Sequence, residues 1–226
     1  MDERASERPL ALAGIVAVVL LLVGTLIAGS PPKPDDPATK IAKFLVDKSD
    51  QIRWGGFIAV LGSIVLLAWL GAVWRMLRRA EGGAPMLAVG AALGAVLGAA
   101  LLNAGGVLLA VMAIIGPAVM GAPATQFFYL LFNNLGSAGA MGIALFVGAV
   151  STVIIETGVV PKIMGWFGAL VALVLLASGG GIASTRDVFF VLTLIGFIGF
   201  TLWTIALSVI MYRGVGSDDS VPVSAP

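Results

Sequence analysis

The sequence contains neither cysteine nor histidine. Without cysteine the chain can form no disulfide, no thiolate nucleophile and no Cys-ligated zinc or iron–sulfur site. Without histidine it can form no His-ligated haem or copper centre and no Ser–His catalytic pair. Of the common side-chain chemistries, those of carboxylates and amides remain open.

Charged residues are also scarce. They make up 11% of the chain, whereas about a quarter is typical of soluble proteins. Hydrophobic residues make up 59%, and the mean hydropathy is +1.08. Lipid is therefore the expected solvent for most of the surface. The net charge of +1 gives no reason to expect a nucleic-acid partner.

Long stretches without charge mark the membrane spans, because a charge at the bilayer centre costs about 2.5–3.5 kcal/mol and a span takes about 20 residues. The sequence predicts an all-α, polytopic transmembrane helix bundle of about six spans in a single membrane domain, residues 1–226. The expected spans are about 9–29, 54–76, 86–115, 125–155, 163–184 and 188–212, with an outer loop at 30–53 and a cytoplasmic tail at 214–226.

The charge-free window from Gly82 to Ile155 is too long for one helix. The Gly116-Pro117 and Ala122-Pro123 steps are the expected break, because proline interrupts helix hydrogen bonding. An alternative break at residues 103–106 would give seven helices. It would also move Lys162 and Arg213 to the opposite side of the membrane.

Lysine and arginine in the short loops predict the orientation. With six spans, one side receives Arg4, Arg8, Arg75, Arg78, Arg79, Lys162 and Arg213. Both termini are therefore expected in the cytoplasm. The first apolar run exceeds the 7–15 or so residues of a signal peptide, which favours an uncleaved membrane anchor. Trp69 and Trp74 beside the three arginines suggest an orientation anchor, with contact to acidic lipids as a second role.

The outer loop contains a pattern typical of a short amphipathic helix. Ile41, Phe44, Leu45 and Lys48 recur at helical spacing, which predicts a helix over about 37–50. Asp36 before Pro37 is a good helix start, with the Asp36 side chain expected to cap free amides. This helix is expected either to rest on the membrane surface or to cover the bundle.

Gly90, Gly94 and Gly98 repeat every four residues in the third span. This spacing returns to one helix face and allows another backbone to approach closely. The sequence leaves open whether the neighbouring backbone belongs to the same chain or to a second copy.

Polar residues within the spans are the main candidates for a functional site. They are Asn103, Gln126, Asn133, Asn134 and Ser137. Unpaired amides are costly in hydrocarbon, so these side chains are expected to face the bundle interior. They either fix helix register by hydrogen bonds or line a polar site for a small solute or a lipid head group.

Glu156 is the one carboxylate beside a long apolar run at the cytoplasmic side. A membrane-embedded glutamate is a candidate proton or ion carrier, but the position near the span end favours an interfacial residue. Enzyme templates otherwise fail. No lysine lies within a span, no paired intramembrane aspartates occur, and no glycine-rich nucleotide loop carries its lysine. The sequence therefore predicts no enzymatic activity and no cofactor.

Three stretches together resemble a known group of proteins. They are DDPATKIAKFLVDKSDQIRWGGFIAVLGSIVLLAWLGAVWRMLRRAEGG, TGVVPKIMGWFGALVAL and FTLWTIALSVIMYR. The resemblance is to uncharacterised six-helix integral membrane proteins of actinobacteria, grouped near a domain of unknown function. It implies six spans in a bacterial plasma membrane and no particular activity.

The sequence thus predicts a non-enzymatic membrane protein, an accessory or scaffold subunit that packs against other membrane proteins or against lipids, with self-association also open. The alternative is a small-solute or lipid transporter or binding protein, with its polar site around Asn103, Asn133 and Asn134.

Overall fold

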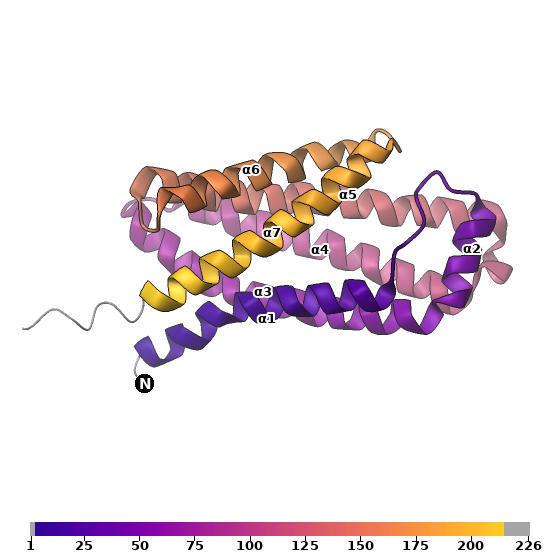
Figure 1. The fold of residues 1–226 in the computed structure, drawn as a ribbon, viewed down its shortest axis with the longest axis horizontal. Coiled ribbons are helices and arrows are strands. Elements are labelled where there is room, and N and C mark those ends of the chain that lie inside the picture. Colours follow the sequence, from indigo (N-terminus) through magenta and orange to yellow (C-terminus); the bar gives the residue numbers. More distant parts are fainter. Residues whose placement is uncertain (1–2, 215–226) are drawn as a thin grey trace, which may run out of the picture.

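The computed structural model describes residues 3–214, with side chains from residue 9 onward. All of the regular structure in these residues is helical, as predicted. The helices are α1 (Glu3–Ala28), α2 (Ala38–Asp47), α3 (Ser49–Glu81), α4 (Met86–Ile115), α5 (Pro117–Thr157), α6 (Lys162–Ser178) and α7 (Asp187–Gly214), with a short 3-10 helix, η1 (Gly179–Ile182), after α6 (Figure 1). The predicted tail, apart from Gly214, lies outside the described residues.

Six of the helices are long and apolar enough to cross a membrane, which confirms the predicted fold class. They are α1, α3, α4, α5, α7 and α6 together with η1. We call the end of the bundle that carries Arg75, Lys162 and Arg213 the inner end, and the opposite end the outer end. The assignment of the inner end to the cytoplasm stays a prediction.

The break between α4 and α5 falls at Gly116-Pro117, as expected. Gly116 has a φ of +76°, a conformation that side chains with a Cβ rarely adopt, and Pro117 takes the first helical position, where its missing N–H costs nothing. The second expected break is only a kink, at Gly121 (φ +72°) ahead of Pro123. The alternative break at residues 103–106 does not occur, since α4 runs through it without interruption.

The outer loop is shorter than predicted, because α3 begins at Ser49 and only Lys48 separates it from α2. Asp50 in the first turn of α3 pairs with Arg53 at 3.5 Å, and the Ser49 hydroxyl donates to the carbonyl of Ala113 at 2.9 Å. Asp36 does not cap α2, whose N-cap is Pro37. Its carboxylate instead accepts the Lys33 amide and pairs with Lys40, each at 2.8 Å.

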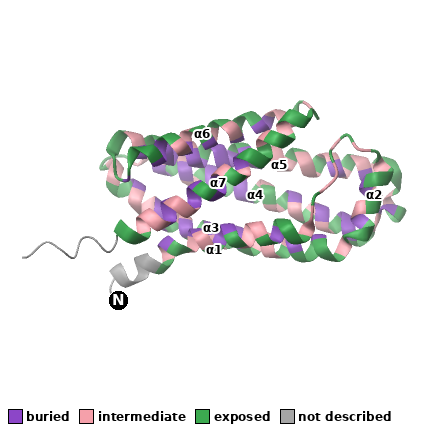
Figure 2. Ribbon diagram, viewed as in Figure 1, coloured by how far each residue is buried: buried purple, intermediate pink, exposed green. Residues whose placement is uncertain are grey.

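Hairpins build the membrane part: α1 packs on α3, α4 on α5, and α6 on α7. Contacts of α3 with α4, α5 with α6, and α7 with α1 close these three hairpins into a ring. Buried positions face the interior of this ring, and exposed positions cover the outward faces of α1, α6 and α7 (Figure 2).

Three aromatic rings meet at the centre of the ring of helices. Trp69 of α3, Phe146 of α5 and Trp203 of α7 each come from the second helix of a hairpin, and each is at most 1% exposed. Their centroids lie 6.0–6.5 Å apart with interplanar angles of 82–89°, the edge-to-face geometry that aromatic pairs favour. We call these residues the aromatic triad. Trp69 is thus a core residue, and its predicted role as an interface anchor is wrong.

Glycine allows the closest helix contacts. A Cβ on Gly142 of α5 would lie 2.5 Å from the Gly98 nitrogen and 2.7 Å from its Cα, and a Cβ on Gly94 would lie 2.7 Å from the Phe146 nitrogen. Gly94 and Gly98 therefore pack within the chain, between α4 and α5. Gly90 has open space around its Cβ position and takes no part in this contact.

A second, smaller core lies at the outer end, where α3, α4 and α5 continue past α1 and α7 (Figure 1). We call it the outer core. Its buried residues come from α2, α3, α4 and α5: Ile41, Leu45, Ile52, Leu109, Met112, Ala113 and Tyr129. Since Ile41 and Leu45 are fully buried, α2 covers the outer ends of these helices.

Candidate functional site

The predicted polar residues do not form one site. Asn103 lies on α4 and accepts a hydrogen bond from the buried Ser63 hydroxyl of α3 at 3.0 Å. This bond connects two neighbouring helices. Asn103 therefore serves to fix their packing and does not join the amides of α5.

Asn133 and Asn134 are adjacent in sequence and point in different directions. The Asn133 amide donates to the Tyr129 carbonyl one turn earlier at 2.8 Å, and its side chain is half-buried beside a cavity. Asn134 is exposed on the outside of α5. The expectation that all the span amides face the bundle interior is therefore wrong for Asn134, because consecutive helix positions are about 100° apart.

The cavity beside Asn133 has a volume of about 200 Å³ and lies at the outer end between α5, the turn after η1 and the start of α7. We call it the outer cavity. Its polar lining includes Lys33, Asn133, Ser137, Ser184, Asp187 and Thr193. Ser137 thus joins Asn133, as the sequence suggested, and the segment before α2 closes the cavity on one side.

That segment, residues 31–34, is fastened to the bundle at three points; we call it the strap. Tyr129 donates its hydroxyl to the Pro32 carbonyl, and Gln126 donates its amide to the Pro34 carbonyl at 3.0 Å. Lys33 pairs with Asp187 of α7 at 2.8 Å. Gln126 therefore holds the strap and does not line the outer cavity.

Charge at the strap is balanced by these contacts. The hydrogen bond and charge of Asp187 raise the pKa of Lys33 above its ordinary value of 10.5. The hydrogen bonds from Lys40 and from the Lys33 amide lower the pKa of Asp36 below its ordinary value of 3.8. Both groups are therefore charged across the physiological pH range. The Lys33–Asp187 ion pair lies at the strap, and the Asp36–Lys40 ion pair follows it.

Chemically, the outer cavity offers hydroxyls, the Asn133 amide, the Lys33–Asp187 ion pair and the Arg186 guanidinium. It holds no nucleophile with an adjacent base, and no group of residues that could hold a metal occurs in the described part of the chain. It is suited to hydrogen bonding with a small polar molecule. Glu156 lies elsewhere, exposed in the last turn of α5, and does not line the outer cavity.

The sequence patterns above do not single out a set of buried hydroxyls. Ser151, Thr201, Thr204 and Ser208, together with the Trp69 indole nitrogen, have no hydrogen-bond partner among residues 3–214. Thr201, Thr204 and Ser208 are spaced by three and four residues, so they share one face of α7. This spacing is visible in the sequence, and it could have indicated a polar face on this helix. A buried hydroxyl without a partner costs about 1–3 kcal/mol, so this polar face of α7 is unusual within an apolar bundle.

Two glycines show a common packing pattern around these groups. A Cβ on Gly14 of α1 would contact the Ser208 hydroxyl and the Trp69 indole nitrogen. A Cβ on Gly168 of α6 would contact the Ser151 hydroxyl and the Trp203 indole nitrogen. In both hairpins, then, a glycine of the first helix accommodates the tryptophan of the second.

Comparison of the chain with protein-family models, with curated proteins and with solved structures finds no match.

Proposed function

We propose that this integral membrane protein is a non-enzymatic accessory or scaffold subunit, which acts by packing against other membrane proteins in a bacterial plasma membrane. The observation that carries the proposal is the filled centre of the bundle. The aromatic triad occupies the middle of the helix ring with at most 1% exposure, and Asn103 is paired with Ser63. Such a core favours a rigid body over a moving transporter.

The α4–α5 tip offers a surface for a partner. Ser49 is level with Ala113, to which it is hydrogen-bonded, so the residues that follow Ala113 lie beyond the charged first turn of α3. Ile114, Ile115 and Val119 are nevertheless 46–78% exposed. Apolar surface beyond the charged first turn of α3 favours contact with another protein.

The experiment is purification in a mild detergent followed by identification of the proteins that co-purify. We expect a partner to be retained by the wild type and lost with Val119→Asp. Leu26→Asp is the matched control, because Leu26 is also 78% exposed at the outer end but lies on α1. If no protein co-purifies, or if both variants lose it equally, the proposal fails.

A small-solute or lipid binding protein is the second candidate, and the outer cavity favours it. Asn133 lines this cavity, whereas Asn134 does not. Purified protein in liposomes therefore offers a matched test. Solute uptake or binding that is lost with Asn133→Leu and kept with Asn134→Leu would support this candidate and count against the scaffold role.

The orientation is part of the proposal and can be tested cleanly, since the chain has no cysteine of its own. A cysteine at Lys43, on α2, should react with a membrane-impermeant maleimide added to intact cells. A cysteine at Arg78, past the inner end of the span, should react only after lysis. The reverse pattern would place the termini outside.

A further inference from the structure

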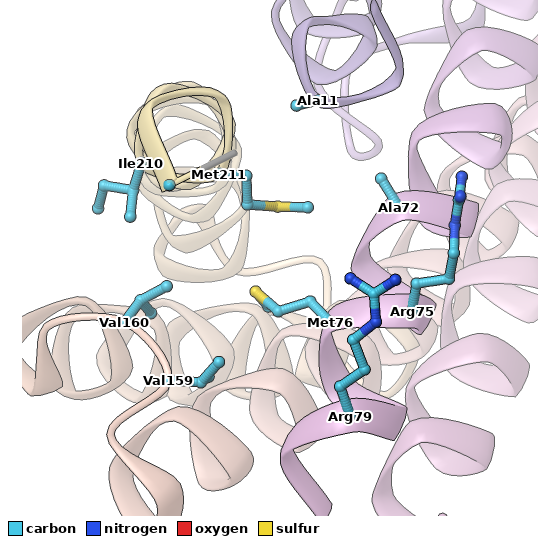
Figure 3. A pocket seen from close by; sticks show the side chains of 10 residues that line it. Ala11, Ala72, Arg75, Met76, Arg79, Val159, Val160, Ile210 and Met211 are labelled. Carbon is cyan, nitrogen blue, oxygen red and sulfur yellow. The ribbon is translucent and has the colours of Figure 1, made fainter. Parts of the chain in front are cut away.

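A cavity of about 280 Å³ lies at the inner end, where α7 leaves α6 and approaches α1. The contact of α7 with α6 includes Trp203, whose indole donates to the Met164 carbonyl at 3.2 Å. Further along α7, Ser208 lies against Gly14 of α1. The wedge that opens between these helices is bounded by Ile210 and Met211 of α7 and by the turn between α5 and α6 (Figure 3). We call it the inner cavity.

Most of its lining is apolar. Ala11, Ala72, Met76, Val159, Val160 and Met211 form much of the wall. Val159 is 41% exposed, so the wall continues to the surface of the bundle. This side of the cavity is suited to hydrocarbon.

Two arginines of α3 supply the charge. Arg75 and Arg79 both line the inner cavity, and Figure 3 shows them rising from α3 beside Ala72 and Met76. The Arg75 Nε donates to the Gly71 carbonyl at 3.4 Å, which turns this side chain back along α3 toward the middle of the membrane. Arg78 is exposed and does not line the cavity.

The nearest carboxylate on α3 has another role. Glu81 accepts hydrogen bonds from the amides of Ala88 at 2.7 Å and Leu87 at 3.2 Å, in the first turn of α4. A carboxylate is stabilised at that position by the helix dipole. Each guanidinium carries five N–H donors, and a phosphate needs only two or three of them in total. The site therefore does not require either arginine to lack other contacts.

We propose that the inner cavity binds an acidic phospholipid of the adjacent leaflet, with its phosphate at Arg75 and Arg79 and the start of an acyl chain along Met76, Val159 and Met211. Guanidinium forks suit phosphate oxygens, and basic residues at this depth attract anionic lipids. A cavity of this size holds a head group and the first part of a chain, while the remainder stays in the bilayer. This site goes beyond the scaffold role and does not depend on it.

The test uses the full-length protein, delipidated in mild detergent and titrated with phosphatidylglycerol or with phosphatidylcholine of the same acyl chains. Bound lipid is counted by mass spectrometry of the intact protein. We expect the wild type and Arg78→Gln to bind phosphatidylglycerol more tightly than phosphatidylcholine. The double variant Arg75→Gln/Arg79→Gln should bind it about 25-fold more weakly, about five-fold for each arginine. Val159→Trp, which obstructs the rim of the inner cavity, should weaken the binding of both lipids.

Three outcomes would overturn the proposal. If Arg78→Gln loses as much affinity as the double variant, the attraction is only that of a basic surface. If millimolar inorganic phosphate displaces the lipid completely, the site recognises a free anion. If Val159→Trp has no effect, the acyl chain lies elsewhere. Unchanged thermal unfolding of each variant in detergent shows that lost binding is not lost folding, and the co-purification test with Val119→Asp reads out the scaffold role separately.

Discussion

The inner and outer parts of the bundle are held together in different ways. In the inner part, six helices contact one another directly, with glycines at the closest approaches and the aromatic triad at the centre. Beyond the outer ends of α1, α6 and α7, α2 covers the remaining helices, and the strap leads into α2. The strap is fastened by side-chain hydrogen bonds to its carbonyls and by an ion pair. Apolar packing thus fixes the inner part, and individual polar contacts fix the strap at the outer end.

The largest effect is expected from the aromatic triad. Trp203→Ala removes a fully buried ring and leaves a cavity among three hairpins, so we expect a loss of about 3–5 kcal/mol in the free energy of unfolding. Denaturant titration in mixed micelles measures it. Trp166→Ala is the control, because Trp166 is 65% exposed and its loss should change stability by less than about 0.5 kcal/mol. Equal losses would mean that the triad is not a core.

The next effect concerns the glycine contact between α4 and α5. Gly142→Ala places a Cβ against the backbone of Gly98, which cannot move aside as a side chain can. We expect a loss of about 1–3 kcal/mol from overpacking. Gly90→Ala meets open space and should be neutral or slightly stabilising, because alanine favours helix. The same titration compares them, and a destabilising Gly90→Ala would point to an unseen neighbour at Gly90.

A smaller and local effect is expected at the strap. Tyr129→Phe removes the hydrogen bond to the Pro32 carbonyl, a contribution of about 1 kcal/mol. Hydrogen exchange should become faster in residues 31–47 and stay unchanged in α6. If exchange in α6 rises equally, the two parts of the molecule unfold together, and they are not stabilised separately.

The smallest effect is the dependence of strap exchange on pH. Asp36 has a lowered pKa, so its contribution is present above its ordinary value of 3.8 and is lost as the pH falls through the lowered pKa. Lys33 has a raised pKa, so its contribution is present below 10.5 and is lost as the pH rises through the raised pKa. Protection of the strap should therefore be constant between these values. Lys33→Met should remove the alkaline step and Lys43→Met should keep it.

Much of the fold could be predicted from the sequence, because hydrocarbon excludes charge and proline interrupts helices. The spacing of charges gave six spans, and Gly116-Pro117 gave the turn between α4 and α5. The predicted span begins at Trp54 and the helix α3 begins at Ser49, because a charge-free window marks only the part of a helix that lies in lipid. Helical structure itself continues through Asp50 and Arg53 to Ser49.

The candidate site was harder to predict, since it depends on which way each side chain faces. Asn133 and Ser137 share the outer cavity, but Asn134 turns outward and Asn103 pairs with another helix. Trp69 illustrates the same limit: beside Trp74 and Arg75 it has the local sequence of an interface residue, yet it is fully buried. Only the arrangement of the three hairpins decides such cases.

The strap also constrains the biogenesis of the protein. Pro32 emerges from the ribosome early, but its anchor Tyr129 follows 97 residues later, and Asp187 follows Lys33 by 154 residues. The first hairpin must therefore enter the bilayer while the connection between α1 and α3 is still unfastened. One of the earliest segments to be translated is among the last to be secured, so a translation product truncated before α5 would lack both of the α5 side chains that hold the strap.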